Sequence, residues 1–153
     1  VLQTFSKAYG LAGLRLGMLF ASKDMVSWLN KIKPPYNINQ LTQEKAIQVL
    51  SNTALIENQI CILKEERTRV EKELGQLNSV LTIYKSDSNF ILVKVKDANN
   101  VYKKLINNKV IVRNRTNQPL CNNCIRITIG TVEENDILIT KMRELEKVQI
   151  ELK

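Results

Sequence analysis

The chain has 153 residues and a mass of 17.5 kDa; 44% of the residues are hydrophobic and 25% are charged. This composition is too apolar for a disordered protein, and no run approaches the roughly 20 apolar residues of a membrane-spanning helix. The formal charge is +8, and the absence of histidine excludes Ser-His-Asp and Cys-His catalysis and every metal site that needs histidine.

The N-terminal part is expected to form a strand, a glycine-rich loop, a second strand and a helix. The first strand covers 1–5, and the loop over 6–17 holds three of the five glycines of the chain. A continuous apolar run over 16–21 is typical of a buried strand. The helix over 24–31 ends before two consecutive prolines, because proline cannot continue a helix.

A long helical segment is expected from Leu41 to about Leu77. Its apolar residues recur at alternating steps of three and four, a heptad-like spacing, at Ile56, Ile60, Leu63, Val70, Leu74 and Leu77. Arg67 occupies the one interrupted position. Because a free-standing coiled coil would need more heptads, we expect a long connecting helix between two domains.

The last half of the chain is expected to form a small α+β domain, in the order strand, strand, helix, strand, strand, helix. Asp97 can cap the first helix, which extends through Ile106. Glu133 and Glu134 lie in the first turn of the closing helix, where negative charge suits the helix dipole. The strands are predicted over 80–84, 90–95, 110–112 and 125–129, and a polar loop over 113–123.

The three cysteines, Cys61, Cys121 and Cys124, form no disulfide framework, which fits a reducing cytoplasm. Cys121 and Cys124 have the C-x-x-C spacing of a zinc half-site or of a redox pair. No second pair completes a zinc site, and a strand follows instead of the helix of a redox motif. We therefore expect no metal and two small loop residues here.

The segment from Thr4 to Gly17 carries the most chemical information. Lys7 follows two small hydroxyl side chains, and Arg15 comes eight residues later, past two glycines. Hydroxyls, backbone N–H groups and an arginine around a glycine-containing turn are the ingredients of a phosphate site. A reactive amine beside a phosphate site indicates a Schiff base with pyridoxal phosphate. On these residues alone, a solvated lysine and turn glycines are the simpler interpretation.

A known family has a similar segment. Residues 6–17 read Ser-Lys-Ala-x-Gly-Leu-Ala-Gly-Leu-Arg-x-Gly. This segment resembles the cofactor-lysine segment of the fold-type I, pyridoxal-phosphate-dependent aminotransferases. Within these, it is most similar to that of the histidinol-phosphate aminotransferases. The resemblance implies that Lys7 is catalytic and holds pyridoxal 5'-phosphate as a Schiff base. It also implies that Ser6 and Arg15 bind the cofactor phosphate, with Thr4 as a further candidate.

A second stretch, from Lys109 to Thr131, resembles the C-terminal domain of the same family. The resemblance implies that Arg126 binds the acidic group of the amino donor or acceptor, and that Arg113 helps to hold an anionic end. A guanidinium group suits this role because it pairs bidentately with carboxylate or phosphate and stays charged. Without the first motif, pairing of each arginine with a nearby carboxylate would be the simpler interpretation. The family often has glycine where Asn108 or Lys109 stands, which leaves the turn before Arg113 open.

The resemblance covers nearly the whole chain but only about the C-terminal half of such an enzyme. It implies an α/β fold in which 1–38 are the remnant of a large pyridoxal-phosphate domain, 39–78 a long connecting helix region and 79–153 a small α+β domain. The sequence begins without Met or a signal peptide, so we expect a truncated chain of a cytoplasmic protein. We expect it to be inactive alone, since the absent half would carry the carboxylate that faces the pyridine nitrogen.

The implied activity is transfer of an amino group between histidinol phosphate and 2-oxoglutarate, in histidine biosynthesis. The expected partners are a small anionic amino donor, a 2-oxo acid and, in the full-length enzyme, a second copy. Another fold-type I aminotransferase or a phosphate-substrate decarboxylase remains an alternative. A small basic domain that binds a polyanion is an alternative of a different class. The basic residues are spread along the chain, so we expect a solvated surface and no nucleic-acid or membrane partner.

Overall fold

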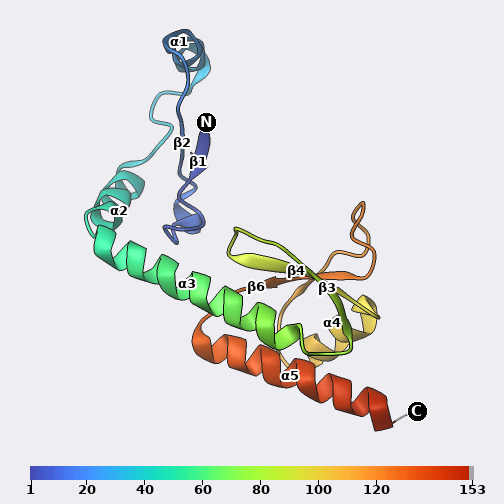
Figure 1. The fold of residues 1–153 in the computed structure, drawn as a ribbon. Coiled ribbons are helices and arrows are strands. Elements are labelled where there is room, and N and C mark those ends of the chain that lie inside the picture. The colour runs from blue at the N-terminus through green and yellow to red at the C-terminus, as the bar shows by residue number, and fades with distance from the viewer. Residues whose placement is uncertain (152–153) are drawn as a thin grey trace. The chain divides into compact units, whose positions relative to one another are not determined.

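A computed structural model describes residues 1–151 of the chain. The chain divides into two compact units, one over Val1–Ile60 and one that begins at Cys61 (Figure 1). The boundary lies inside helix α3, Thr53–Leu74, and the three-part domain division stays a prediction. None of the helices in the described residues is long and apolar enough to cross a membrane.

The first unit begins with a two-stranded antiparallel hairpin, followed by two helices. Strand β1, Leu2–Thr4, pairs with β2, Gly17–Leu19, and the 3-10 helix η1, Ala12–Leu14, lies in the loop between them. Helix α1, Lys23–Ile32, begins after Ser22, and α2, Gln40–Leu50, begins after Asn39. Each of these cap residues accepts a hydrogen bond from a backbone N–H in the first turn, which satisfies a group that the helix itself leaves unpaired.

The expected single helix from Leu41 to Leu77 is wrong: the structure has two helices, α2 and α3, with a break at Ser51 and Asn52. The Ser51 hydroxyl donates to the Ile47 carbonyl at 2.8 Å, and the Asn52 side chain accepts from the Leu55 N–H at 3.1 Å. These short polar side chains end one helix and cap the next, because they compete with the backbone for its own hydrogen bonds. The apolar stripe begins at Ile56, after the break, so it gave no evidence that one helix continues across these residues.

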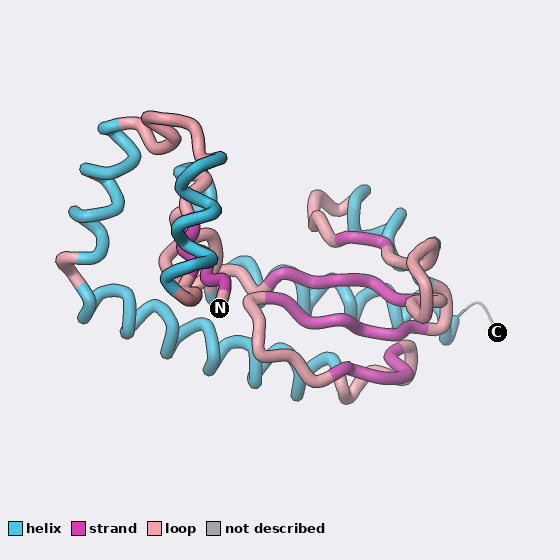
Figure 2. The backbone as a smooth tube through the Cα atoms, turned by 90° about the horizontal axis from the view of Figure 1, so that it is seen from above, coloured by secondary structure: helices cyan, strands magenta, loops and turns pink. Residues whose placement is uncertain are grey.

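The second unit is a four-stranded antiparallel sheet in the order β3-β4-β6-β5, visible as neighbouring strands in Figure 2. Its elements are β3 (Val80–Tyr84), β4 (Phe90–Val95), α4 (Ala98–Asn107), β5 (Arg113–Asn114), β6 (Cys124–Thr128) and α5 (Val132–Glu151). Alternate residues of β4 and β6, among them Val93, Ile125 and Ile127, are buried with apolar residues of α3, α4 and α5. The helices therefore cover one face of the sheet and leave the side chains of its other face without a helical cover (Figure 1).

The predicted strand over 110–112 is also wrong, since β5, Arg113–Asn114, begins directly after that range, in the predicted polar loop. Helix α4 ends with two backbone hydrogen bonds, from Lys109 to the Ile106 carbonyl at 2.8 Å and from Val110 to the Leu105 carbonyl at 2.9 Å. This pattern requires a left-handed residue after the helix, and Lys109 has φ 63°. The geometry explains why a glycine suits this turn. The chain reaches pairing distance of β6 only at Arg113.

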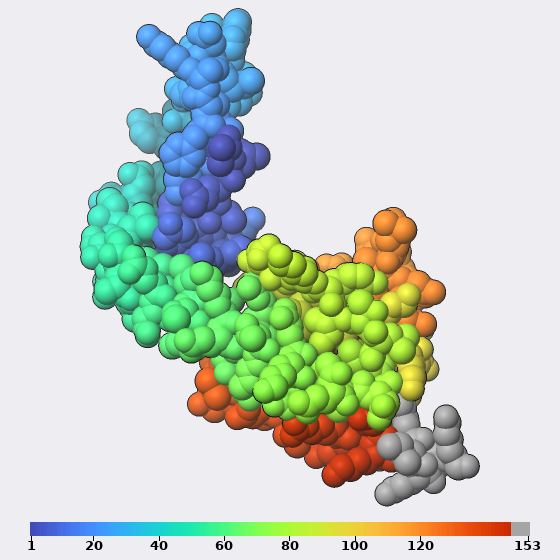
Figure 3. Space-filling view, viewed as in Figure 1, coloured from blue at the N-terminus to red at the C-terminus, as the bar shows by residue number. Residues whose placement is uncertain are grey.

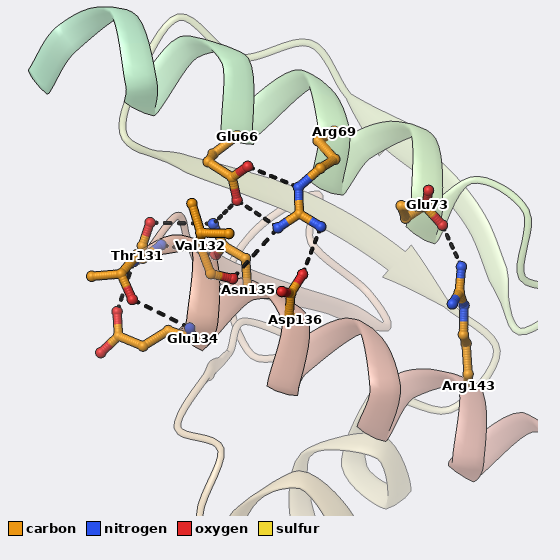
Figure 4. A network of polar contacts seen from close by, with 10 residues as sticks. Glu66, Arg69, Glu73, Thr131, Val132, Glu134, Asn135, Asp136 and Arg143 are labelled. Carbon is orange, nitrogen blue, oxygen red and sulfur yellow. Dashed lines mark hydrogen bonds and ion pairs between the residues drawn. The ribbon is translucent and has the colours of Figure 1, made fainter. Parts of the chain in front are cut away.

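A polar cluster joins α3 to α5 in the second unit (Figure 4). The buried Asn135 side chain donates to Glu66 at 2.8 Å and accepts from the Gly130 N–H at 3.0 Å. Arg69 pairs with both oxygens of Glu66 and with Asp136 at 2.7 Å. Hydrogen bonding from Arg69 holds the pKa of the Glu66 carboxyl below its usual value, against the opposing effect of burial. The cluster therefore keeps a buried carboxylate charged and fully hydrogen-bonded.

We expect Asn135→Ala to lower the free energy of unfolding by about 2–3 kcal/mol, because it removes one hydrogen bond to the buried Glu66 carboxylate and leaves the Gly130 N–H without its acceptor. The matched control is Asp136→Ala at the next position, which removes a mostly exposed ion pair and should cost at most about 1 kcal/mol. Urea unfolding followed by circular dichroism measures both. Equal losses in the two variants would contradict the role of Asn135.

Candidate functional site

The segment around Lys7 forms the loop of the hairpin in the first unit. The last strand pair is Thr4 opposite Gly17, and the Phe5 N–H then donates to the Leu16 carbonyl at 3.2 Å. A Cβ atom at Gly17 would lie 3.1 Å from the Gln3 carbonyl oxygen, so the two strands approach closely at this glycine. The hairpin register therefore fixes where the loop begins and ends.

Backbone hydrogen bonds also shape the loop itself. The Gly10 N–H donates to the Lys7 carbonyl at 3.0 Å, and the Leu11 N–H donates to the Phe5 carbonyl at 3.0 Å. Gly10 has φ 65°, a conformation that glycine adopts without steric cost. Phe5 and Leu11 are buried, whereas Lys7 is exposed. The loop thus folds back on its apolar residues and presents the lysine outward.

The predicted phosphate-binding residues gather on this loop. The last hydrogen bond of the hairpin joins Phe5 and Leu16, so Ser6 is the first loop residue after one strand and Arg15 the last before the other. The Ser6 N–H donates to the Thr4 hydroxyl at 3.1 Å. The segment from Thr4 to Gly17 contains no acidic residue. Neither Lys7 nor Arg15 forms an ion pair with the side chains that the structure describes. Two cations and two hydroxyls without a protein counter-ion fit a cofactor that bears a phosphate.

The two predicted substrate arginines lie together on the sheet of the second unit. Arg113 of β5 is the register partner of Arg126 of β6, so both side chains project from the face that the helices leave uncovered. The guanidinium carbon of Arg126 lies 5.0 Å from the centre of the Phe90 ring, which supports it by a cation–π contact. The Nε of Arg126 is buried and has no hydrogen-bond partner.

This arrangement leaves positive charge without a protein partner. Like charges directly opposite each other on neighbouring strands are unfavourable. No carboxylate in the described part of the chain pairs with Arg113 or Arg126, so the simpler interpretation of a nearby acidic partner does not hold there. A bound carboxylate or phosphate would offset this positive charge and supply a hydrogen-bond acceptor. The chemistry of this face fits an anionic ligand.

The six predicted site residues thus form two sets, one in each unit. Thr4, Ser6, Lys7 and Arg15 belong to the first, and Arg113 and Arg126 to the second. Sequence reasoning missed Phe90, the ring below Arg126. The alternation of residues along β4 could have placed Phe90 on the face of the sheet opposite the core. That alternation does not predict that β4 pairs with β6, which brings Phe90 near Arg126.

Comparison with known proteins gives consistent matches. The family model of aminotransferase class I and II matches residues 1–142. A histidinol-phosphate aminotransferase of Christiangramia forsetii is 52% identical over 146 residues, which are 95% of this chain and 42% of that protein. The chain therefore spans less than half the length of this relative.

Two solved structures show the same fold. A crystal structure from Burkholderia pseudomallei has a TM-score of 0.89 and 30% identity, and the match covers 95% of this chain and 44% of that one. Histidinol-phosphate aminotransferase from Sinorhizobium meliloti, in complex with pyridoxal-5'-phosphate, has a TM-score of 0.81 and 25% identity, over 94% of this chain and 41% of that one. The predicted α/β fold and family resemblance are confirmed.

We expect Gly10→Ala to loosen the lysine loop, because an alanine at positive φ costs about 1–2 kcal/mol. Hydrogen exchange of the Leu11 amide, which bonds across the loop, should become roughly five- to thirtyfold faster. Gly13→Ala is the matched control, because space is open around both glycines and only Gly10 has a positive φ. Equal protection of Leu11 in the two variants would contradict the role assigned to Gly10.

Proposed function

Because the chain belongs to the class I and II aminotransferase family, we propose that it carries the cofactor lysine and the substrate arginines of a histidinol-phosphate aminotransferase. The observation that carries this proposal is the hairpin loop with Lys7 and Arg15, two exposed cations in a segment without acidic residues. The identity to histidinol-phosphate aminotransferases supports the choice of substrate.

The first unit supplies the residues for the cofactor. Pyridoxal 5'-phosphate, when bound, supplies an aldehyde that takes up amino groups and a ring that withdraws electrons from the substrate. We assign covalent attachment to Lys7 Nζ, and binding of the phosphate to Ser6, Arg15 and Thr4. When its amine is free, Lys7 is the general acid–base that moves the proton at the substrate α-carbon.

The second unit supplies the residues for the substrate. Arg126 binds the carboxylate or phosphate end of the substrate through its guanidinium fork, and Arg113 adds a second positive charge. Fixing this end limits the orientations of the reacting C–H bond and lowers the entropy cost of the reaction. Histidinol phosphate and 2-oxoglutarate both carry such an anionic end.

Several finer predictions stay open to experiment. Another fold-type I aminotransferase or a phosphate-substrate decarboxylase would use the same cations, and a panel of amino donors separates these activities. The homodimer, the place in histidine biosynthesis, the cytoplasmic location and the inactivity of this segment alone also remain predictions. The match to the aminotransferase family favours an enzyme over the alternative of a polyanion-binding domain.

We expect Lys7→Ala to abolish transamination of histidinol phosphate in a protein that has the full length of the relatives. The loss follows because no other amine would hold the cofactor aldehyde and move the substrate proton. Lys45→Ala is the matched control: Lys45 is an exposed lysine of the same unit whose amine contacts Gln48, and its loss should leave the rate unchanged. Formation of glutamate from 2-oxoglutarate measures the rate, and near-normal turnover by the Lys7 variant would refute the assignment.

A further inference from the structure

Cys121 and Cys124, which the aminotransferase chemistry does not use, lie at the two ends of one tight turn. The Cys124 N–H donates to the Cys121 carbonyl at 3.0 Å, and Asn123 between them has φ 55°. A turn closed in this way brings its end Cα atoms within about 7 Å. Disulfides join cysteines whose Cα atoms are roughly 4.4–6.8 Å apart. The backbone therefore already holds the pair near disulfide distance.

Neighbouring strands hold this turn in place. The Val95 N–H at the end of β4 donates to the Asn123 carbonyl at 2.9 Å, and the Arg115 N–H after β5 donates to the Cys124 carbonyl at 2.8 Å. The Cys121 N–H is itself bonded to the Gln118 carbonyl at 3.1 Å. A bond between the two sulfurs would thus form across a turn whose backbone is already held by hydrogen bonds.

The two thiols differ in accessibility. The loop between β5 and β6, orange in Figure 3, projects from the surface of the second unit, and Cys121 at its end is half-buried. Cys124 is buried, and its Sγ donates to the Asn122 carbonyl at 3.6 Å, back over the turn. Burial raises the pKa of the Cys124 thiol, which lowers its thiolate fraction at neutral pH. Cys121 is therefore the thiol that reacts first.

We propose that Cys121 and Cys124 form a reversible disulfide when the protein meets oxidised glutathione. The Cys121 thiolate attacks one glutathione sulfur, which forms a mixed disulfide and releases one reduced glutathione. The Cys124 thiolate then attacks the Cys121 sulfur and releases the second. The protein loses two protons and two electrons, and the glutathione disulfide gains them. The new bond lies at the start of β6, two residues before Arg126 on the same face.

The test uses the complete 153-residue chain with Cys61→Ser, which removes the exposed third thiol and leaves both turn cysteines in place. The protein is equilibrated with oxidised and about 1 mM reduced glutathione, quenched with acid, and analysed by intact mass and peptide mapping. We expect loss of two hydrogens, with Cys121 and Cys124 in one cross-linked peptide. This form should exceed the glutathione adduct by about tenfold, because the second thiol has a high effective concentration.

Two single-thiol variants provide the comparison. Both are made in the Cys61→Ser background. The Cys124→Ala variant keeps the buried position apolar and should accumulate the glutathione adduct on Cys121. The Cys121→Ser variant has only the buried thiol and should react with glutathione more slowly. Stable adducts or cross-linked dimers in the protein with both turn cysteines would overturn the proposal. So would persistence of the dithiol in a glutathione mixture that modifies the Cys124→Ala variant.

Discussion

The pairing of β5 with β6 fixes the positions of Arg113 and Arg126, to which we assign substrate binding, although β5 has only two residues. Register alone puts Arg113 and Arg126 on one face of the sheet, while Ile125 and Ile127 anchor the same strand in the core on the other face. The apolar core thus holds two positive charges next to each other although they repel. The face that carries the arginines has no helix over it, because all three helices of the unit pack on the other face of the sheet.

In the first unit, too, strand pairing and apolar burial determine where the cations lie. Hairpin pairing that ends at Thr4 and Gly17 determines which residues enter the loop, and the buried Phe5 and Leu11 hold it together. Lys7 and Arg15 are then left exposed without acidic partners in the loop. In both units, backbone hydrogen bonds and apolar burial position cations that have no ion-pair partner among the described side chains. This is the electrostatic pattern that an enzyme for anionic substrates and a phosphate-bearing cofactor requires.

Local patterns predicted most elements of the fold. The alternation over 90–95 and the Asp97 cap gave a strand and a helix close to those observed. The break at Ser51 and Asn52 was missed because the apolar stripe begins only at Ile56, after the break, and therefore says nothing about continuity across it. Strand β5 was misplaced because its start depends on how α4 ends at Lys109. The assignment of the site residues rests on motif resemblance and remains a prediction. The support of Arg126 by Phe90 depends on strand register, which a single sequence does not determine.

The most direct test of the account is to label this chain with pyridoxal 5'-phosphate, and in parallel with pyridoxal, which lacks the phosphate. Borohydride reduction and peptide mass spectrometry then locate the pyridoxyl groups among all lysines. We expect the phosphate form to label Lys7 in preference to every other lysine. We expect this preference to disappear with pyridoxal, because we assign phosphate binding to Ser6 and Arg15. Scattered labelling by both reagents would contradict it.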